Sequence, residues 1–286
     1  MTYRELFQEA VRLLREAGIE DAEYECRELL SHCCGMTRLS YIAQQHKDVQ
    51  EHEKRALLTA AARRAEGCPL QYILGSWSFM DCELAVGEGV LIPRDDTEVC
   101  VREALRLLRE QKLTRPVIAD LCSGSGAIAI ALAQQLPTAR IWAVELSEKA
   151  FCYLEQNIRS NMRTDDRITA VRGDIRQVYS RFEDGFFDGI IANPPYICTD
   201  ELPTLQKEVQ SEPVMALDGG ADGLDFYRVI TKYWASKLKS GGTLSLEIGE
   251  EQGMAVSGML KDNGFSHIRI IQDIQGLDRA VCGIRK

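Results

Sequence analysis

The sequence is poor in the residue patterns that hold metals or form disulfides. It has four histidines in 286 residues, and none is spaced from a cysteine as metal ligands are. Its ten cysteines are scattered and include no C-x-x-C pair. In a chain of this length such scattered cysteines are typical of reduced thiols. We therefore predict no disulfides and no metal site.

Long apolar runs and an excess of basic residues are also missing. No run reaches the roughly 18 apolar residues that a membrane span requires, and the charged, amphipathic N-terminus lacks the apolar core of a signal peptide. The net charge of −9 works against tight, sequence-independent binding to nucleic acid, because such affinity comes largely from Lys and Arg on phosphates. We expect a monomeric cytoplasmic protein with no membrane and no direct nucleic-acid partner.

Three kinds of pattern follow one another along the chain. Residues 1–68 predict a small helical bundle, in which apolar residues recur at i, i+3 and i+4 until Gly18, and Asp21 is expected to cap the second helix. Residues 69–96 predict a β-hairpin linker, since Gly and aromatic residues punctuate short alternating runs. Strand and helix patterns then alternate over residues 97–286, which predicts a mostly parallel sheet with helices on both faces. A closing strand pair is expected to add one antiparallel strand.

A glycine-rich turn follows the predicted strand at residues 116–121. The stretch "ADLCSGSGAIAIALA", residues 119–133, reads as strand, turn and helix. Gly124 and Gly126 allow backbone angles and close approaches that a Cβ would block. The turn opens a helix N-terminus, which favours nucleotide-like ligands. Gly124-x-Gly126-x-x-Ala129 also satisfies the dinucleotide fingerprint, so NAD is an alternative ligand.

Three acids accompany this turn. Asp120 precedes it, and the resulting acidic-x-x-x-Gly-x-Gly arrangement resembles S-adenosylmethionine-dependent methyltransferases. Asp120 is expected either to attract the ammonium group of that donor or to order the loop. Glu145 ends the next strand, where a carboxylate can accept from ribose hydroxyls. Asp174 ends the third strand and is placed to accept from an adenine amino group, with Ile175 as an apolar wall. Glu145 and Asp174 could instead be ordinary helix caps.

The fourth strand should stop at about Ala192, because Pro194 and Pro195 cannot continue a central strand. The following "NPPY" resembles the signature of methyltransferases that act on planar nitrogens, in adenine, exocyclic amines or glutamine amides. The Asn193 side-chain oxygen and the Pro194 carbonyl can each accept one N–H of a substrate NH₂ and aim its nitrogen at the methyl group. Such positioning would supply much of the rate. Tyr196 is expected to pack on the flat substrate group.

Four further stretches match one protein family: "PLQYILG" (69–75), "LIPRDDTE" (91–98), "EPVMALDGGADGLDFYR" (212–228) and "EIGEEQ" (247–252). With the glycine loop and "NPPY" they resemble the PrmC/HemK family of release factor glutamine methyltransferases over essentially the whole chain. The resemblance implies a Rossmann-like α/β methyltransferase domain with a seven-stranded sheet, preceded by a helical domain that docks the release factor. It implies methylation of the glutamine amide nitrogen in the Gly-Gly-Gln motif of class 1 peptide chain release factors, with S-adenosylmethionine as donor.

The resemblance also assigns roles to residues. It implies donor contacts from Asp120, Cys122, Ser123, Gly124, Ser125, Gly126, Glu145, Asp174, Ile175 and Asn193. It implies that the glutamine amide is held by Asn193, Pro194, Pro195 and Tyr196, of which Asn193, Pro194 and Tyr196 are expected to be catalytic. The sequence departs from the family in three places: Cys122 replaces a frequent glycine, Asp95 a frequent proline, and Ile175 a frequent aromatic residue.

The stretch "LIPRDDTEV" predicts a strand end, a turn and a helix that Thr97 caps. We expect Arg94 and Glu98 to be structural partners there rather than donor contacts.

Other functions stay open at this stage. Adenine-N6 methylation of nucleic acid would use the same donor and the same "NPPY", but the chain has no basic or aromatic-basic patch to hold an extruded base. A dehydrogenase using NAD would leave "NPPY" and Asp174 unexplained. A non-enzymatic protein on a decayed methyltransferase scaffold would not need Asn193 and the loop glycines.

Overall fold

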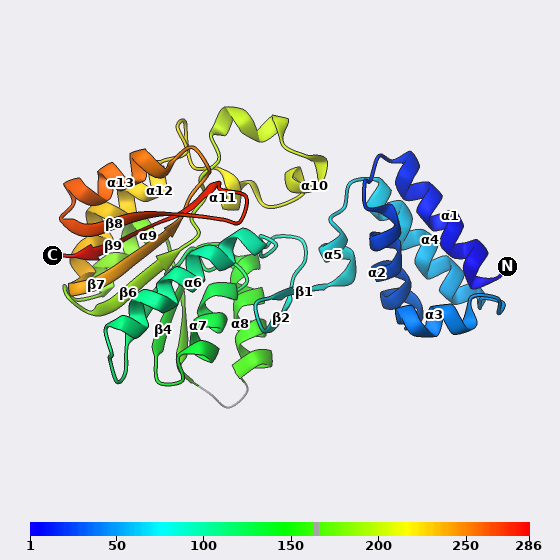
Figure 1. Cartoon of the computed structure of the whole chain (residues 1–286), viewed down its shortest axis with the longest axis horizontal. Helices are drawn as coiled ribbons and strands as arrows, with labels where there is room; N and C mark the ends of the chain where they lie inside the picture. The colour runs from blue at the N-terminus through cyan, green and yellow to red at the C-terminus, as the bar shows by residue number, and fades with distance from the viewer. Residues whose placement is uncertain (163–165) are drawn as a thin grey trace. The chain divides into compact units, whose positions relative to one another are not determined.

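The computed structural model describes residues 1–162 and 166–286. Contacts between Cα atoms divide the chain into two compact units (Figure 1). The helical unit consists of Met1–Ser76 together with Gln206–Ser211. The sheet unit consists of Trp77–Leu205 and Glu212–Lys286. A short segment of the later sequence thus belongs to the N-terminal helical unit.

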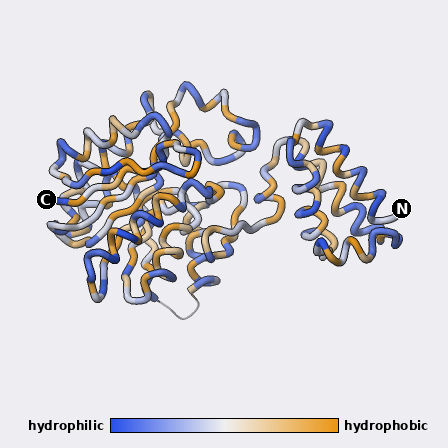
Figure 2. The backbone as a smooth tube through the Cα atoms, in the orientation of Figure 1, coloured by the Kyte–Doolittle hydropathy of each residue, from blue (hydrophilic) through white to orange (hydrophobic). Residues whose placement is uncertain are grey.

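The helical unit is the predicted small bundle. Its helices are α1 (Tyr3–Glu16), α2 (Ala22–Cys34), α3 (Arg38–Gln44), α4 (Glu51–Ala65) and α5 (Leu70–Leu74). A capping box between Thr2 and Glu5 starts α1, and Gly18 follows its end with a φ of +81°. Hydrophilic and hydrophobic stretches alternate along these helices in Figure 2. The apolar stripes of α1, α2 and α4 meet in one core.

Of two local expectations for this part of the chain, one is confirmed in position only and the other is wrong. Asp21 stands at the N-cap of α2, but its side chain makes no capping hydrogen bond. Residues 70–74 form the one-turn helix α5 and not part of a hairpin. Pro69 precedes that turn and Gly75 ends it in the left-handed conformation, while Leu70 and Ile73 pack into the helical core. The hairpin is confined to β1 (Ser76–Phe79) and β2 (Cys82–Ala85).

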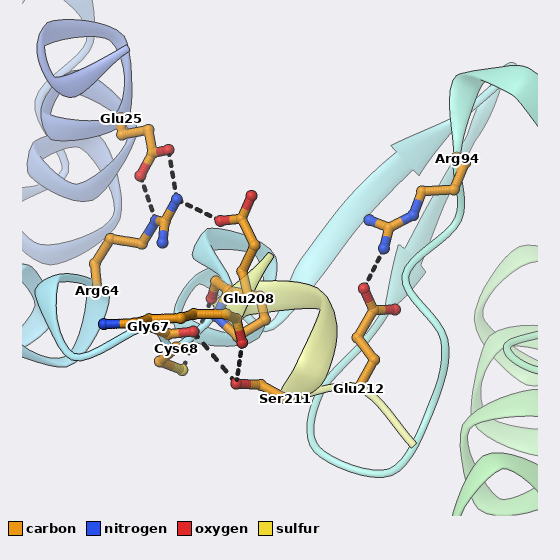
Figure 3. A network of polar contacts seen from close by, with 10 residues as sticks. Glu25, Arg64, Gly67, Cys68, Arg94, Glu208, Ser211 and Glu212 are labelled. Carbon is orange, nitrogen blue, oxygen red and sulfur yellow. Dashed lines mark hydrogen bonds and ion pairs between the residues drawn. The ribbon is translucent and has the colours of Figure 1, made fainter. Parts of the chain in front are cut away.

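A buried arginine holds the later segment within the helical unit (Figure 3). Arg64 of α4 donates two hydrogen bonds, of 2.5 and 2.9 Å, to the carboxylate of Glu25. Its other contact is Glu208, on the short helix α10 (Lys207–Gln210), at 2.5 Å. The Ser211 hydroxyl donates to the carbonyl of Gly67 at 3.3 Å. Residues 206–211 are therefore tied to the helical bundle at two places.

The sheet unit contains the predicted seven-stranded sheet. Its strand order is β5-β4-β3-β6-β7-β9-β8. The strands are β3 (Val117–Leu121), β4 (Arg140–Glu145), β5 (Ile168–Arg172), β6 (Phe187–Ala192), β7 (Leu238–Glu247), β8 (Phe265–Gln272) and β9 (Asp278–Arg285). β9 pairs antiparallel with both β7 and β8, and β3 to β7 pair in parallel. The single antiparallel strand and the end of β6 at Ala192 are both as predicted.

Helices cover both faces of this sheet (Figure 1). One face carries α6 (Asp95–Glu110), α7 (Ala127–Gln135) and α8 (Glu148–Met162), and the other carries α9 (Ile175–Val178), α12 (Asp225–Val229) and α13 (Gly253–Asp262). Alternate strand residues enter opposite cores: Ile118 and Ile191 one, Ala119 and Ile190 the other. The near-continuous apolar strands are thus explained by burial on both faces.

Short irregular helices complete the sheet unit. They are η1 (Tyr179–Arg181), η2 (Thr199–Thr204) and α11 (Val214–Leu217). The helix predicted from residue 225 changes form along its length, because α12 is followed by a π-helical turn at Ile230–Trp234 and a 3₁₀ turn at Ala235–Lys237. None of the helices in the described ranges 1–162 and 166–286 is both long and apolar enough to cross a bilayer.

Replacing Arg64 should weaken the helical unit. Arg64→Met leaves Glu25 largely buried without its cation, since the Glu25 side chain is only 13% exposed. We expect a loss of about 3 kcal/mol, measured by hydrogen exchange of the α2 and α4 amides in the full chain. Arg63→Met removes the neighbouring exposed arginine and should change stability by less than about 0.5 kcal/mol. Equal protection in the two variants would contradict the structural importance of the Arg64 contacts.

Candidate active site

A cavity of about 880 Å³ lies at the carboxyl ends of the parallel strands. Its walls come from the loop after β3, the end of β4, the residues after β5, and Asn193 and Pro195 after β6. Residues 89 and 91–93, Thr97 and several residues between 213 and 229 complete it. Its volume is within the ~300–1,000 Å³ of small-molecule sites. Open parallel sheets bind ligands at this edge.

The glycine loop between β3 and α7 shapes one wall. Gly124 has a φ of +53°, and a Cβ there would meet no protein atom within 4 Å. Gly126 has a φ of +85°, and its Cβ would lie 2.6 Å from a Leu154 methyl carbon. Cys122 adopts a φ of +60°, in the left-handed region that favours glycine. The loop therefore turns toward the cavity at Gly124, while Gly126 lets α8 pack closely.

The predicted donor-binding residues differ in how they meet this cavity. Those that line it are Cys122, Ser123, Gly124, Ser125, Glu145, Asp174, Ile175 and Asn193. Asp120 and Gly126 lie behind its surface. Asp120 is fully buried, and its carboxylate accepts from the Ala129 amide at 3.1 Å. Burial raises the pKa of Asp120 to about 7. Of its two expected roles, these contacts favour ordering the loop.

Glu145 joins two turns at the end of β4. One of its oxygens accepts from the Gly124 amide at 2.8 Å, and the other from the Ser147 amide at 2.7 Å. Its side chain also lines the cavity, and burial raises its pKa. The capping and ligand-facing interpretations of Glu145 are therefore compatible, because an ionised carboxylate can accept further hydrogen bonds.

Asp174 likewise caps a helix and lines the cavity. It stands at the N-cap of α9 and accepts from the Arg176 amide at 2.8 Å. The Arg176 guanidinium contacts the same carboxylate at 2.7 Å, and its hydrogen bonds lower the pKa of Asp174. Arg176 also lines the cavity, beside the buried Ile175. Sequence reasoning missed Arg176, although a cation two residues after a capping acid is a signal for such a pair.

"NPPY" follows β6, and the segments from 212 to 228 and 247 to 252 pack around it. A Cβ on Gly219 would lie 2.7 Å from Tyr196 Cα, and one on Gly223 would lie 2.3 Å from the Tyr196 carbonyl oxygen. The Gln252 side chain donates to that carbonyl at 2.9 Å. Asn193 and Pro195 line the cavity, whereas Pro194 and Tyr196 do not. Tyr196 packs partly into the core instead.

Thr97 has a different role from the one predicted. α6 begins at Asp95 with Arg94 as its N-cap, so Thr97 lies inside the first turn and does not cap the helix. Its hydroxyl accepts a hydrogen bond from Asn193 Nδ2 at 3.1 Å. The sequence suggested a cap because the hydroxyl of a Thr near a helix start usually accepts from a backbone N–H of the first turn. This hydroxyl instead accepts from a side chain 96 residues away.

Arg94 and Glu98 have structural partners, as expected. The Arg94 guanidinium is ion-paired with the buried Glu212, whose other oxygen accepts from the Ile92 amide at 3.0 Å (Figure 3). Glu98 accepts from the Met80 amide at 3.0 Å. Asn157, which sequence reasoning missed, donates to the Ser125 carbonyl at 2.9 Å and so supports the glycine loop from α8.

The cavity brings a wall that carries two acids together with an amide group. Gly124, Glu145 and Asp174 lie on the first, and Asn193 stands where the cavity meets the end of β6. The chain from 1 to 162 and from 166 to 286 holds no cluster of three His, Cys, Asp or Glu side chains suited to a metal ion. The polar side chains that line this largely apolar cavity can form hydrogen bonds to a ligand and orient a polar group.

Known proteins similar to this chain were found by sequence and by structure. The family of the PrmC N-terminal domain matches residues 5–75, and that of the TRM5/TYW2 methyltransferase domain matches residues 99–232. A release factor glutamine methyltransferase of Moorella thermoacetica is 39% identical, over 100% of this chain and 99% of its own length. One of Geobacter sulfurreducens is 41% identical, over 94% and 92%.

A solved structure of similar fold is the catalytic domain of hMettl16 in complex with MAT2A 3′UTR hairpin 1. It has a TM-score of 0.58 and 14% identity, and the match covers 91% of this chain and 88% of that one. At such low identity the likeness concerns the fold alone.

Gly124→Ala should weaken donor binding without unfolding the protein. The added Cβ meets no protein atom but enters the cavity wall, and the φ of +53° adds a strain of about 1 kcal/mol. We expect the affinity for S-adenosylmethionine, measured by calorimetry, to fall at least about tenfold. Gly185→Ala is the matched control, because Gly185 has a φ of +68° and an equally open Cβ direction. A donor affinity that is the same in both variants would place the donor elsewhere.

Proposed function

Because the chain belongs to the release factor glutamine methyltransferase family, we propose that it methylates the side-chain amide nitrogen of a glutamine in a release factor. The acceptor is the glutamine of the Gly-Gly-Gln motif in class 1 peptide chain release factors, and the donor is S-adenosylmethionine. The chain is thus a methyltransferase that acts on a protein. The observation that carries the proposal is the full-length identity of 39% to a protein of that activity, together with Asn193 at the cavity.

The cavity fits a donor of this kind. The open direction of the Gly124 Cβ leaves room for a ligand against the loop backbone. We assign Glu145 to the ribose hydroxyls, and Asp174 and Ile175 to the adenine. When bound, the donor supplies a methyl group on a positively charged sulfur. Asp120 acts from behind the loop, by holding the Ala129 amide.

Asn193 is suited to receive a planar NH₂ group. One N–H of its Nδ2 is donated to the Thr97 hydroxyl, and Oδ1 is the atom of the amide that can accept. An amide nitrogen is a weak nucleophile because its lone pair is delocalised, so its reaction depends on position and direction. We propose that Asn193 Oδ1 and the Pro194 carbonyl accept the two N–H groups of the glutamine. Pro195 lines the cavity beside that contact, whereas Tyr196 supports the contact from behind the cavity wall.

Several narrower expectations accompany this proposal. We propose that the helical domain, residues 1–68, docks the release factor, and that the protein is a cytoplasmic monomer without a direct nucleic-acid partner. Adenine-N6 methylation remains the alternative that shares "NPPY". The full-length relatives named for glutamine methylation favour the protein acceptor, as does the net charge of −9.

The acceptor can be identified by labelling. The protein is incubated with methyl-labelled S-adenosylmethionine and either a class 1 release factor or a duplex oligonucleotide. We expect label on the release factor only, and none when its Gly-Gly-Gln glutamine is replaced by alanine, because only the amide nitrogen is aimed at the donor. Label on the oligonucleotide would favour the alternative acceptor.

Asn193→Ala tests the proposed acceptor contact. The variant should bind S-adenosylmethionine with near wild-type affinity, while kcat falls by about 100-fold because the amide is no longer oriented. Asn161→Ala is the matched control, since Asn161 contacts the Glu83 and Asn157 carbonyls away from the cavity. A kcat within threefold of wild type in Asn193→Ala would remove this residue from the transfer step.

A further inference from the structure

The segment "EIGEEQ" contributes a buried acid, Glu247, that the proposed function has not used. Glu247 is the last residue of β7 and is 1% exposed. The Thr97 side chain lies close enough to act as a hydrogen-bonding group that lowers the pKa of Glu247. Thr97 also accepts from Asn193 Nδ2 at 3.1 Å. Glu247, Thr97 and Asn193 therefore lie in series, and the series ends at the cavity.

We propose that Glu247, acting through the Thr97 hydroxyl, fixes the direction of the Asn193 amide and thereby orients the acceptor NH₂. Glu247 and Thr97 are positioning residues, because they act on the acceptor only through Asn193. The inference rests on the proposed function, and it names the device that sets the orientation of the acceptor amide.

Which of these groups donates and which accepts follows from counting their protons. A threonine hydroxyl has one proton to donate. An ionised Glu247 can only accept, so it takes that proton, and Thr97 Oγ1 then has only lone pairs to offer Asn193. The Asn193 amide must therefore turn its NH₂ to Thr97 and its oxygen to the cavity. In the structure Nδ2 is the donor to Thr97, which is this direction.

A protonated Glu247 removes this constraint. It can donate to Thr97 Oγ1, which frees the hydroxyl proton for Asn193 Oδ1. The amide can then present its NH₂ to the cavity, where it faces the NH₂ of the acceptor, donor against donor. Such a pair cannot form a hydrogen bond. The ionisation of Glu247 thus decides whether Asn193 accepts from the substrate.

The ionised acid also acts on the transfer step. The acceptor nitrogen forms a bond to the methyl carbon as the carbon–sulfur bond breaks, and one nitrogen-bound proton leaves to water afterwards. Positive charge grows on that nitrogen and its N–H groups during the step. A negative charge at the far end of the series strengthens the acceptor oxygen of Asn193, because hydrogen bonds in series polarise one another.

The surroundings of Glu247 bring its pKa close to neutral pH. Burial is the main cause that raises its pKa to about 7, and the Thr97 side chain opposes this rise. Oε2 has no hydrogen-bond partner among the residues that the structure describes. The nearby cation Arg279 is shared with Asp273 at 2.8 Å and Asp96 at 3.6 Å. The titratable or charged groups that interact with Glu247 are Arg94, Asp96, Cys100, Tyr196, Tyr227 and Arg279.

The first test compares two replacements of Thr97. Thr97→Val keeps the branched shape and removes the hydroxyl, whereas Thr97→Ser keeps the hydroxyl. We expect kcat for the release factor to fall about 30-fold in Thr97→Val and to be largely restored in Thr97→Ser, with the affinity for S-adenosylmethionine changed less than about twofold in both. Equal kcat values in the two folded variants, checked by thermal unfolding, would overturn the proposal.

The second test uses pH. Wild-type kcat should rise as the pH is raised through about 7, because the accepting form of Glu247 is then populated. This rise should be absent in Glu247→Gln, whose side chain no longer ionises. Glu103→Gln, a similarly buried acid that is paired with Arg106 and Arg269, should keep both the wild-type kcat and the rise. A rise near pH 7 that persists in Glu247→Gln would overturn the proposal.

A third readout does not depend on the acceptor. The side-chain NH₂ resonance of Asn193, identified by its absence in Asn193→Ala, should shift with pH near 7 in the wild type and stay constant in Glu247→Gln. Constancy in the wild type would overturn the inference. Failure to methylate any release factor would instead contradict the proposed function. The Asn193 resonance would still test whether Glu247 acts on Asn193 through Thr97.

Discussion

Three acids at the carboxyl edge of the sheet hold the loops around the cavity. Asp120 on β3, Glu145 on β4 and Glu247 on β7 are all at or next to the end of their strands. Each is buried. Asp120 accepts from the Ala129 amide and Glu145 from the Gly124 amide, while the Thr97 side chain beside Glu247 lowers the pKa of that acid. A buried acid is costly unless it is hydrogen-bonded or protonated, and burial raises the pKa of all three. The shape of the cavity therefore depends on these pairings.

Two of the stretches that resemble the family, residues 212–228 and 247–252, pack around "NPPY". Gly219 and Gly223 leave space for the backbone of Tyr196, and Gln252 holds its carbonyl. The chain between Leu205 and Glu212 belongs to the helical unit, where Glu208 contacts Arg64. The same chain continues directly into residues that line the cavity, from Pro213 onward. The segment that joins "NPPY" to the residues from 213 onward thus passes through the helical unit.

Much of the fold could be predicted because its signals are local. The period-two strands and the periodic α1 are set by the side chains of a few neighbouring residues. The end of β6 follows from prolines that lack an N–H. The errors have local causes too: α5 is a single turn that its packing into the helical core stabilises, and Asp21 offers a capping side chain that is not used. The candidate site was predictable as a set of loops at one sheet edge, because parallel strands bring their carboxyl ends together.

The sequence alone therefore determined the order of elements, the glycine turn and the placement of an amide after a stopped strand, since each depends on the chemistry of adjacent residues. Tertiary structure decided which distant side chains meet. Thr97 and Asn193 are 96 residues apart, Arg94 and Glu212 are 118 apart, and Arg64 and Glu208 are 144 apart. No local period encodes such pairs, because they depend on strand order and on the packing of helices across the sheet. The direction of the Asn193 amide is therefore a property of the folded chain, although the residue itself can be found in the sequence.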